Sequence, residues 1–138
     1  MAREGACGNV LVDTDVIISF LRNYPPAVEF VREASRSGRI RVSLATVCEL
    51  FEGATMSADK NKVLEVESFV SSCEVITPSV KTARVFGQIA ANILKRGEGI
   101  PEFDLLIASS AIEFNEQLAT RNTRHFNRIA GLKLCATW

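Results

Sequence analysis

Short apolar runs alternate along this chain with longer segments in which apolar residues recur every three or four positions. The first run, residues 10–12, has no polar alternation and ends at Asp13. Such a run predicts a strand of a parallel sheet, because helices cover both faces of these sheets and bury both sides of each strand. Four further strands are expected, at residues 40–44, 74–78, 117–120 and 132–135.

Helical periodicity is clearest in residues 79–96, where apolar side chains share one face. Five further helices are expected, at residues 16–22, 27–37, 46–55, 60–72 and 101–114, with a turn or single helical turn at 122–128. Strands that alternate with helices indicate βαβ units. The pattern therefore predicts an α/β protein, a three-layer α/β/α sandwich with a mostly parallel central sheet. We expect residues 1–138 to form a single domain, because the chain is short and has no linker or repeat.

Composition narrows the class of protein further. The 16 acidic side chains balance the 16 basic ones, so the chain has no bulk charge that would attract nucleic acid. No segment has the length and hydrophobicity of a signal peptide or a membrane span, and we expect a cytoplasmic protein with reduced thiols. The four cysteines contain no CxxC pair and only one histidine is present, which makes a zinc site improbable.

Polar side chains follow the expected strands or open the next helix, where they would share one edge of the sheet. These are Asp13, Glu49, Asp104 and Asn122. Each has a structural alternative: Glu49 would complete a capping box with Thr46, Asp104 would favour a helix dipole, and Asn122 would cap a helix. Asp13 is the hardest to explain in this way, because an unpaired charge at a buried strand end is costly.

Three carboxylates at one edge repel each other, and a divalent cation is the usual remedy. Mg²⁺ or Mn²⁺ prefers oxygen ligands, and a site of this kind can activate water and hold a phosphodiester. We expect Asp15 to cap the first helix and not to contact the metal directly. Four basic residues after the fourth strand suit phosphate contacts, although each is equally typical of a solvated turn: Arg121, Arg124, His125 and Arg128.

Four motifs in this order resemble those of PIN-domain ribonucleases of the VapC type, the toxins of toxin–antitoxin pairs. They are residues 10–17, 43–50, 100–108 and 119–126. The resemblance implies that three acids, Asp13, Glu49 and Asp104, bind the metal, with Asn122 at a fourth position that is aspartate in many relatives. It implies that Asp15 and Thr120 help to order the site. It also implies Mg²⁺- or Mn²⁺-dependent cleavage of RNA, a homodimer, and inhibition by a cognate antitoxin.

The sequence is also compatible with two other functions. In a haloacid-dehalogenase-like phosphatase, which also begins with a strand and Asp-x-Asp, Asp13 would be the nucleophile and Asp15 a general acid. The small size and the lack of an evident lysine after a later strand weaken that interpretation. The second alternative is a catalytically silent PIN fold that serves as a binding module, and Asn122 keeps this possibility open.

Overall fold

The central feature of the computed structural model, which describes residues 9–138, is one five-stranded sheet. Its strands are β1 (Val10–Val12), β2 (Arg41–Ser43), β3 (Glu74–Ile76), β4 (Gln117–Ala119) and β5 (Leu134–Cys135). They lie in the order β3-β2-β1-β4-β5, and every pairing among the described strands is parallel. The predicted parallel sheet is confirmed.

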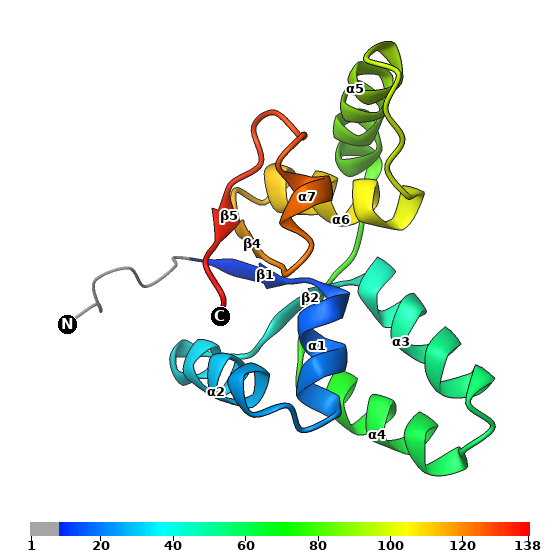
Figure 1. Cartoon of the computed structure of the whole chain (residues 1–138), viewed down its shortest axis with the longest axis vertical. Helices are drawn as coiled ribbons and strands as arrows, with labels where there is room; N and C mark the ends of the chain where they lie inside the picture. The colour runs from blue at the N-terminus through cyan, green and yellow to red at the C-terminus, as the bar shows by residue number, and fades with distance from the viewer. Residues whose placement is uncertain (1–8) are drawn as a thin grey trace.

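The helices cover both faces of this sheet (Figure 1). They are α1 (Thr14–Leu21), α2 (Pro25–Ala34), the 3₁₀ turn η1 (Ser35–Ser37), α3 (Leu44–Met56), α4 (Lys60–Ser71), α5 (Val80–Lys95), α6 (Glu102–Glu113) and α7 (Thr123–Phe126). Neighbouring residues of a strand face opposite cores: Val12 packs with side chains of α1 to α4, whereas Leu11 packs with those of α5 to α7. This double burial explains the unbroken apolar run of β1 and confirms the α/β/α sandwich.

The strand order creates a switch point beside β1. From β1 the chain adds β2 and β3 on one side, and it later returns to add β4 and β5 on the other. Ligand crevices in open α/β sheets lie at such a point, beyond the carboxyl ends of the strands. The backbone amide of Asp13 donates to Ala119 O at 2.9 Å, so the ends of β1 and β4 meet there.

Two helices begin directly at strand ends and so begin earlier than predicted. Asp13 caps α1, and its Oδ1 accepts a 2.8 Å hydrogen bond from Thr14 N. Asp15 therefore does not cap this helix, and that prediction is wrong. Ser43 caps α3, and its side chain accepts a hydrogen bond from Ala45 N. Because α3 begins at Leu44, Glu49 lies in the second helical turn instead of the first. Thr46 lies inside the helix, so the capping-box alternative for Glu49 is also wrong.

An ion cluster holds the opposite, amino edge of the sheet. The Arg41 guanidinium, at the start of β2, pairs with Glu74 at 2.6 Å and also with Glu116, which precedes β4. The Glu116 side chain is 1% exposed, whereas that of Glu74 is 50% exposed. Glu74 thereby links β2 to β3, and Glu116 links β2 to the segment that leads into β4. The cluster lies at the edge of the sheet opposite Asp13.

The cysteines differ from one another in state. Cys48 and Cys73 are free thiols, as expected, whereas Cys135 is disulfide-bonded, so the expectation of reduced thiols is wrong for that residue.

Within residues 9–138, every helix is too short or too polar to cross a lipid bilayer.

Candidate active site

Asp13 lies at the centre of the carboxyl edge and is almost entirely buried, with 4% of its surface exposed. Its Oδ1 accepts the Thr14 amide, and its Oδ2 accepts a 2.7 Å hydrogen bond from Thr120 Oγ1. Within residues 9–138, no Lys or Arg side chain forms an ion pair with Asp13. A buried carboxylate is thus held by hydrogen bonds alone.

Glu49 reaches this edge from α3 and is fixed by α1. Thr14 Oγ1 donates a 2.7 Å hydrogen bond to Glu49 Oε1 and lies 3.0 Å from Thr46 Oγ1. Thr46 is fully buried one helical turn before Glu49. Thr14 therefore connects the residue next to Asp13 with the second carboxylate.

Asp104 lies in the first turn of α6, as predicted, and faces α7. Its Oδ2 is 3.4 Å from His125 Nδ1. Asn122 stands at the N-cap position of α7 without a side-chain capping bond, and its Nδ2 lies 2.9 Å from the same His125 nitrogen. His125 thus lies between the third acid and the predicted fourth ligand.

Asp15 joins the group from the first turn of α1. Its Oδ2 accepts a 2.9 Å hydrogen bond from the backbone amide of Arg121, and Thr120 Oγ1 is 3.5 Å away. Thr120 Oγ1 also accepts the amide of Asn122 at 3.0 Å. The residues that follow β4 are therefore tied to both aspartates of the Asp-Thr-Asp triplet.

The electrostatics show that these acids act on one another. Burial, together with the negative charges of Asp15 and Asp104, raises the pKa of Asp13 from the ordinary 3.8 to about 7, although the hydrogen bonds from Thr120 and Thr14 lower it. Burial also raises the pKa of Glu49 and that of Asp104. Asp104 and Asp15 add to the shift of Glu49, and Asp15 adds to that of Asp104. The structure has brought together the acids that the sequence singled out.

The donor set fits a hard divalent cation. It consists of carboxylate and amide oxygens, and repulsion among the acids would be relieved by a dication. No three His, Cys, Asp or Glu side chains in the described part of the chain form a ready cluster around one point.

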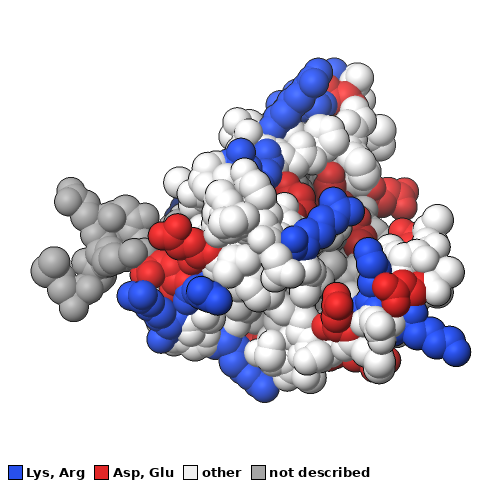
Figure 2. All heavy atoms as spheres, turned by 60° about the horizontal axis from the view of Figure 1, so that its bottom comes forward, with Lys and Arg blue, Asp and Glu red and all other residues white. Residues whose placement is uncertain are grey.

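The predicted phosphate-binding residues differ in their partners. Arg121 and Arg124 are exposed, and His125 contacts Asp104. The Arg128 guanidinium instead pairs with Glu98, 3.2 Å away. On the face in Figure 2, basic and acidic side chains are interspersed, so nucleic acid would meet separate cationic groups and no continuous basic strip.

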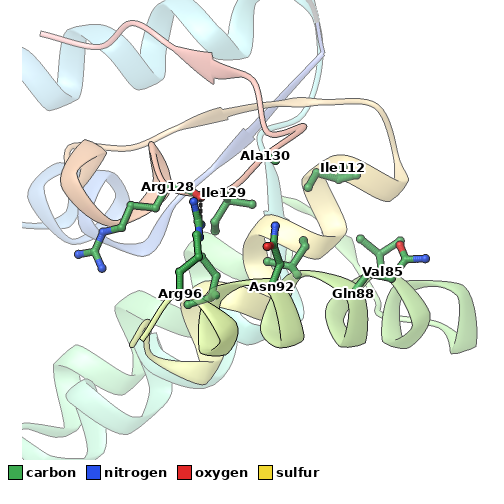
Figure 3. A pocket seen from close by; sticks show the side chains of 10 residues that line it. Val85, Gln88, Asn92, Arg96, Ile112, Arg128, Ile129 and Ala130 are labelled. Atoms are coloured by element: carbon green, nitrogen blue, oxygen red, sulfur yellow. Dashed lines mark hydrogen bonds between the residues drawn. The ribbon is translucent and has the colours of Figure 1, made fainter. Parts of the chain in front are cut away.

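A separate cavity of about 180 Å³ lies between α5, α6 and the segment after α7 (Figure 3). Its lining mixes apolar side chains, such as Ile112 and Ile129, with polar ones. Arg96 closes one side by donating to the Arg128 carbonyl oxygen at 2.5 Å. Within the described residues, none of the acids above lines this cavity, so it is not part of the candidate site.

Two residues of the site were missed in the sequence. Thr14 and Thr46 position Glu49, yet neither was singled out for this role. The role of Thr46 could have been predicted, because residues three positions apart in a helix, such as Thr46 and Glu49, lie on the same face. The contact with Thr14 depends on how α1 packs against α3, which no local pattern reveals.

Comparison with known proteins places this geometry in a family. Residues 10–132 match the family model described as PIN domain. The tRNA(fMet)-specific endonuclease VapC of Shigella flexneri is 33% identical over 124 residues, which cover 89% of this chain and 93% of that protein. Ribonuclease VapC2 of Haemophilus influenzae is 31% identical over 124 residues, with the same shares.

Solved structures agree with the sequence relatives. The crystal structure of VapBC2 from Rickettsia felis bound to a DNA fragment from their promoter has a TM-score of 0.85 at 27% identity, over 95% of this chain and 99% of that one. DNA-bound VapBC from Salmonella typhimurium has a TM-score of 0.83 at 29% identity, over 91% of this chain and 96% of that one. The chain therefore belongs to the PIN-domain family and, within it, to the VapC ribonucleases.

Proposed function

We propose that this chain is a metal-dependent endoribonuclease, the toxin of a VapBC-type toxin–antitoxin pair, with its acids as the metal site. The observation that carries the proposal is the grouping of these acids at the switch point of the sheet: the charge of Asp15 raises the pKa of Asp13, Glu49 and Asp104, and that of Asp104 raises the pKa of Asp13 and Glu49. No Lys or Arg of residues 9–138 forms an ion pair with the three. Family membership supports the same activity.

Asp13, Glu49 and Asp104 would hold Mg²⁺ or Mn²⁺, with Asn122 at a fourth position. When bound, such an ion lowers the pKa of a coordinated water and neutralises charge on the phosphodiester. The chain supplies the positioning. Thr120 holds the Asp13 carboxylate, Thr14 holds that of Glu49, and His125 contacts that of Asp104. Arg124 is exposed and precedes His125 in the chain, so it would suit a backbone phosphate.

We further propose an RNA substrate, a cognate VapB-type antitoxin, a homodimer and a cytoplasmic location, with residues 1–138 as a single domain. Support for the antitoxin comes from the solved relatives described as VapBC complexes. Support for RNA comes from the relatives named as ribonucleases. The comparisons favour neither a haloacid-dehalogenase-like phosphatase nor a silent binding module.

The test is cleavage of RNA by the purified chain with Mn²⁺ or with EDTA. We expect Asp13→Asn and Glu49→Gln to lose more than about a hundredfold in rate, because each removes a charge that would bind the ion. Glu67→Gln is the matched control: Glu67 is an exposed acid in a different helix, α4. Equal cleavage by the wild type and both site variants would contradict the proposal.

A further inference from the structure

A cluster of aromatic rings lies next to the acidic edge and has no part in the site described above. The segment after β5 runs back toward α2 (Figure 1), and the ring of Trp138 lies 6.2 Å from that of Phe30, edge to face. The Tyr24 ring lies 6.1 Å from that of Trp138, in a tilted arrangement. The Arg121 guanidinium covers the Trp138 ring at 4.9 Å from its centroid.

The cluster is partly buried and partly open. Phe30 and Trp138 pack against the core, which fixes their position. Tyr24 is 49% exposed. Arg121 is exposed and its guanidinium lies over the Trp138 ring, so the group presents a cation and aromatic rings at the surface. Phe30 and Trp138 anchor this surface because both pack against the core.

This surface is continuous with the acids. The backbone amide of Arg121 binds Asp15 Oδ2 at 2.9 Å, while its guanidinium stacks on Trp138 and lies 3.5 Å from Thr137 Oγ1. One residue therefore joins the candidate metal site to the aromatic cluster. A strand of RNA held at the acids would have its next nucleotides within reach of Arg121.

We propose that Arg121, Trp138 and Tyr24 form a stacking surface for an unpaired nucleobase of the RNA substrate, a proposal that rests on the function proposed above. Unpaired bases stack on aromatic rings and on arginine planes, whatever their identity. Trp138 is the positioning residue, because its ring lies under the Arg121 guanidinium. An RNA occupant is favoured over a protein because the group combines a cation with flat rings beside a site that would hold a phosphodiester.

The chain carries its own reporter for this contact, because Trp138 is its sole tryptophan. The full chain in EDTA would be titrated with a single-stranded oligoribonucleotide while Trp138 emission is recorded. An abasic strand of equal length and polyglutamate serve as polyanion controls. We expect emission to change with the base-carrying strand at concentrations at least about tenfold lower than with the abasic strand. Equal responses to these ligands, a response to polyglutamate alone, or no response to RNA would overturn the proposal.

Variants separate stacking from charge. Arg121→Lys keeps the charge but loses the plane, so binding of a labelled oligonucleotide should weaken about tenfold while abasic binding stays the same. Trp138→Ala should weaken binding and raise KM with little change in kcat, and Trp138→Phe should restore most of the loss. Phe114→Ala, at an exposed aromatic residue after α6, is the matched control. Unchanged binding in Arg121→Lys would contradict the inference, while Mn²⁺-dependent cleavage by the same preparation would leave the proposed function intact.

Discussion

Thr120 Oγ1 donates a 2.7 Å hydrogen bond to Asp13 Oδ2, although the two residues are 107 positions apart in the sequence. Thr120 follows β4 and Asp13 follows β1. The threonine thereby fixes the most buried acid of the site and stabilises its charged form, since it accounts for the largest lowering of the Asp13 pKa. The same hydroxyl accepts the Asn122 amide, so it also sets the course of the chain after β4.

Thr120→Val should shift the pH dependence of cleavage. The variant removes the hydrogen bond that lowers the pKa of Asp13, so that pKa rises and a proton competes with the metal ion up to higher pH. The acidic limb of the rate profile should move to higher pH, and the rate at pH 7 should fall about tenfold or more. Thr120→Ser keeps the donor and should retain the wild-type profile. An unshifted limb in Thr120→Val would show that the bond has no such role.

Asp13→Asn should stabilise the metal-free protein in neutral and alkaline solution. The folded-state pKa of about 7 lies above the ordinary 3.8, so the folded chain binds the proton more readily. Its free energy of unfolding therefore falls as the pH rises through this window. The neutral amide abolishes that loss, which is on the order of 4 kcal/mol above pH 7 and vanishes below pH 4.

Thermal unfolding in EDTA at a series of pH values measures this effect. Mn²⁺ should raise the melting temperature of the wild type but not that of Asp13→Asn, because binding to the folded state alone stabilises it. A variant that is less stable than the wild type by the same amount at every pH would refute the argument.

Asn122→Asp should strengthen metal binding. Asn122 is next to His125, which contacts Asp104, and a fourth carboxylate there would add negative charge to the site. We expect the Mn²⁺ concentration for half-maximal cleavage to fall several-fold. Asn127→Asp, an exposed position after α7, controls for added charge in the same segment. Equal Mn²⁺ requirements in Asn122→Asp and the wild type would argue against a ligand at this position.

Glu116→Gln should destabilise the fold without changing the chemistry. It leaves the Arg41 guanidinium without its most buried partner, and breaking a buried ion pair costs about 3–5 kcal/mol. Glu74→Gln removes the exposed partner and should cost less than about 1 kcal/mol. Urea unfolding measures both, and cleavage per folded molecule should be unchanged. Similar losses in the two variants would show that burial does not decide the strength of this cluster.

Local pattern predicted the elements of the fold well, because burial on both faces gives unbroken apolar strands and one-sided burial gives helical periodicity. Residues 60–72 were predicted as a helix and α4 spans Lys60–Ser71. The starts of α1 and α3 were missed by two residues, since Asp13 and Ser43 cap these helices directly at strand ends. The strand order depends on long-range pairing and was not predictable from such patterns.

The site was predictable as far as it depends on acids at strand ends and helix starts. Asp13 and Asp104 lie where the pattern placed them, and Glu49 reaches the same edge one turn further along its helix. The hydroxyls that hold these acids were harder to predict, because Thr14 meets Glu49 only once two helices have packed. The role of Trp138 was not predicted for the same reason: its contact with Arg121 forms only once β5 has paired with β4.

Titration of the metal-free chain with Mn²⁺ by calorimetry tests the central claim most directly, because it measures ion binding without requiring the right RNA. We expect binding by the wild type and by Glu67→Gln, and a loss of affinity of more than about tenfold in Asp13→Asn and in Asp104→Asn. Equal affinity in all four proteins, or no binding by the wild type, would contradict it.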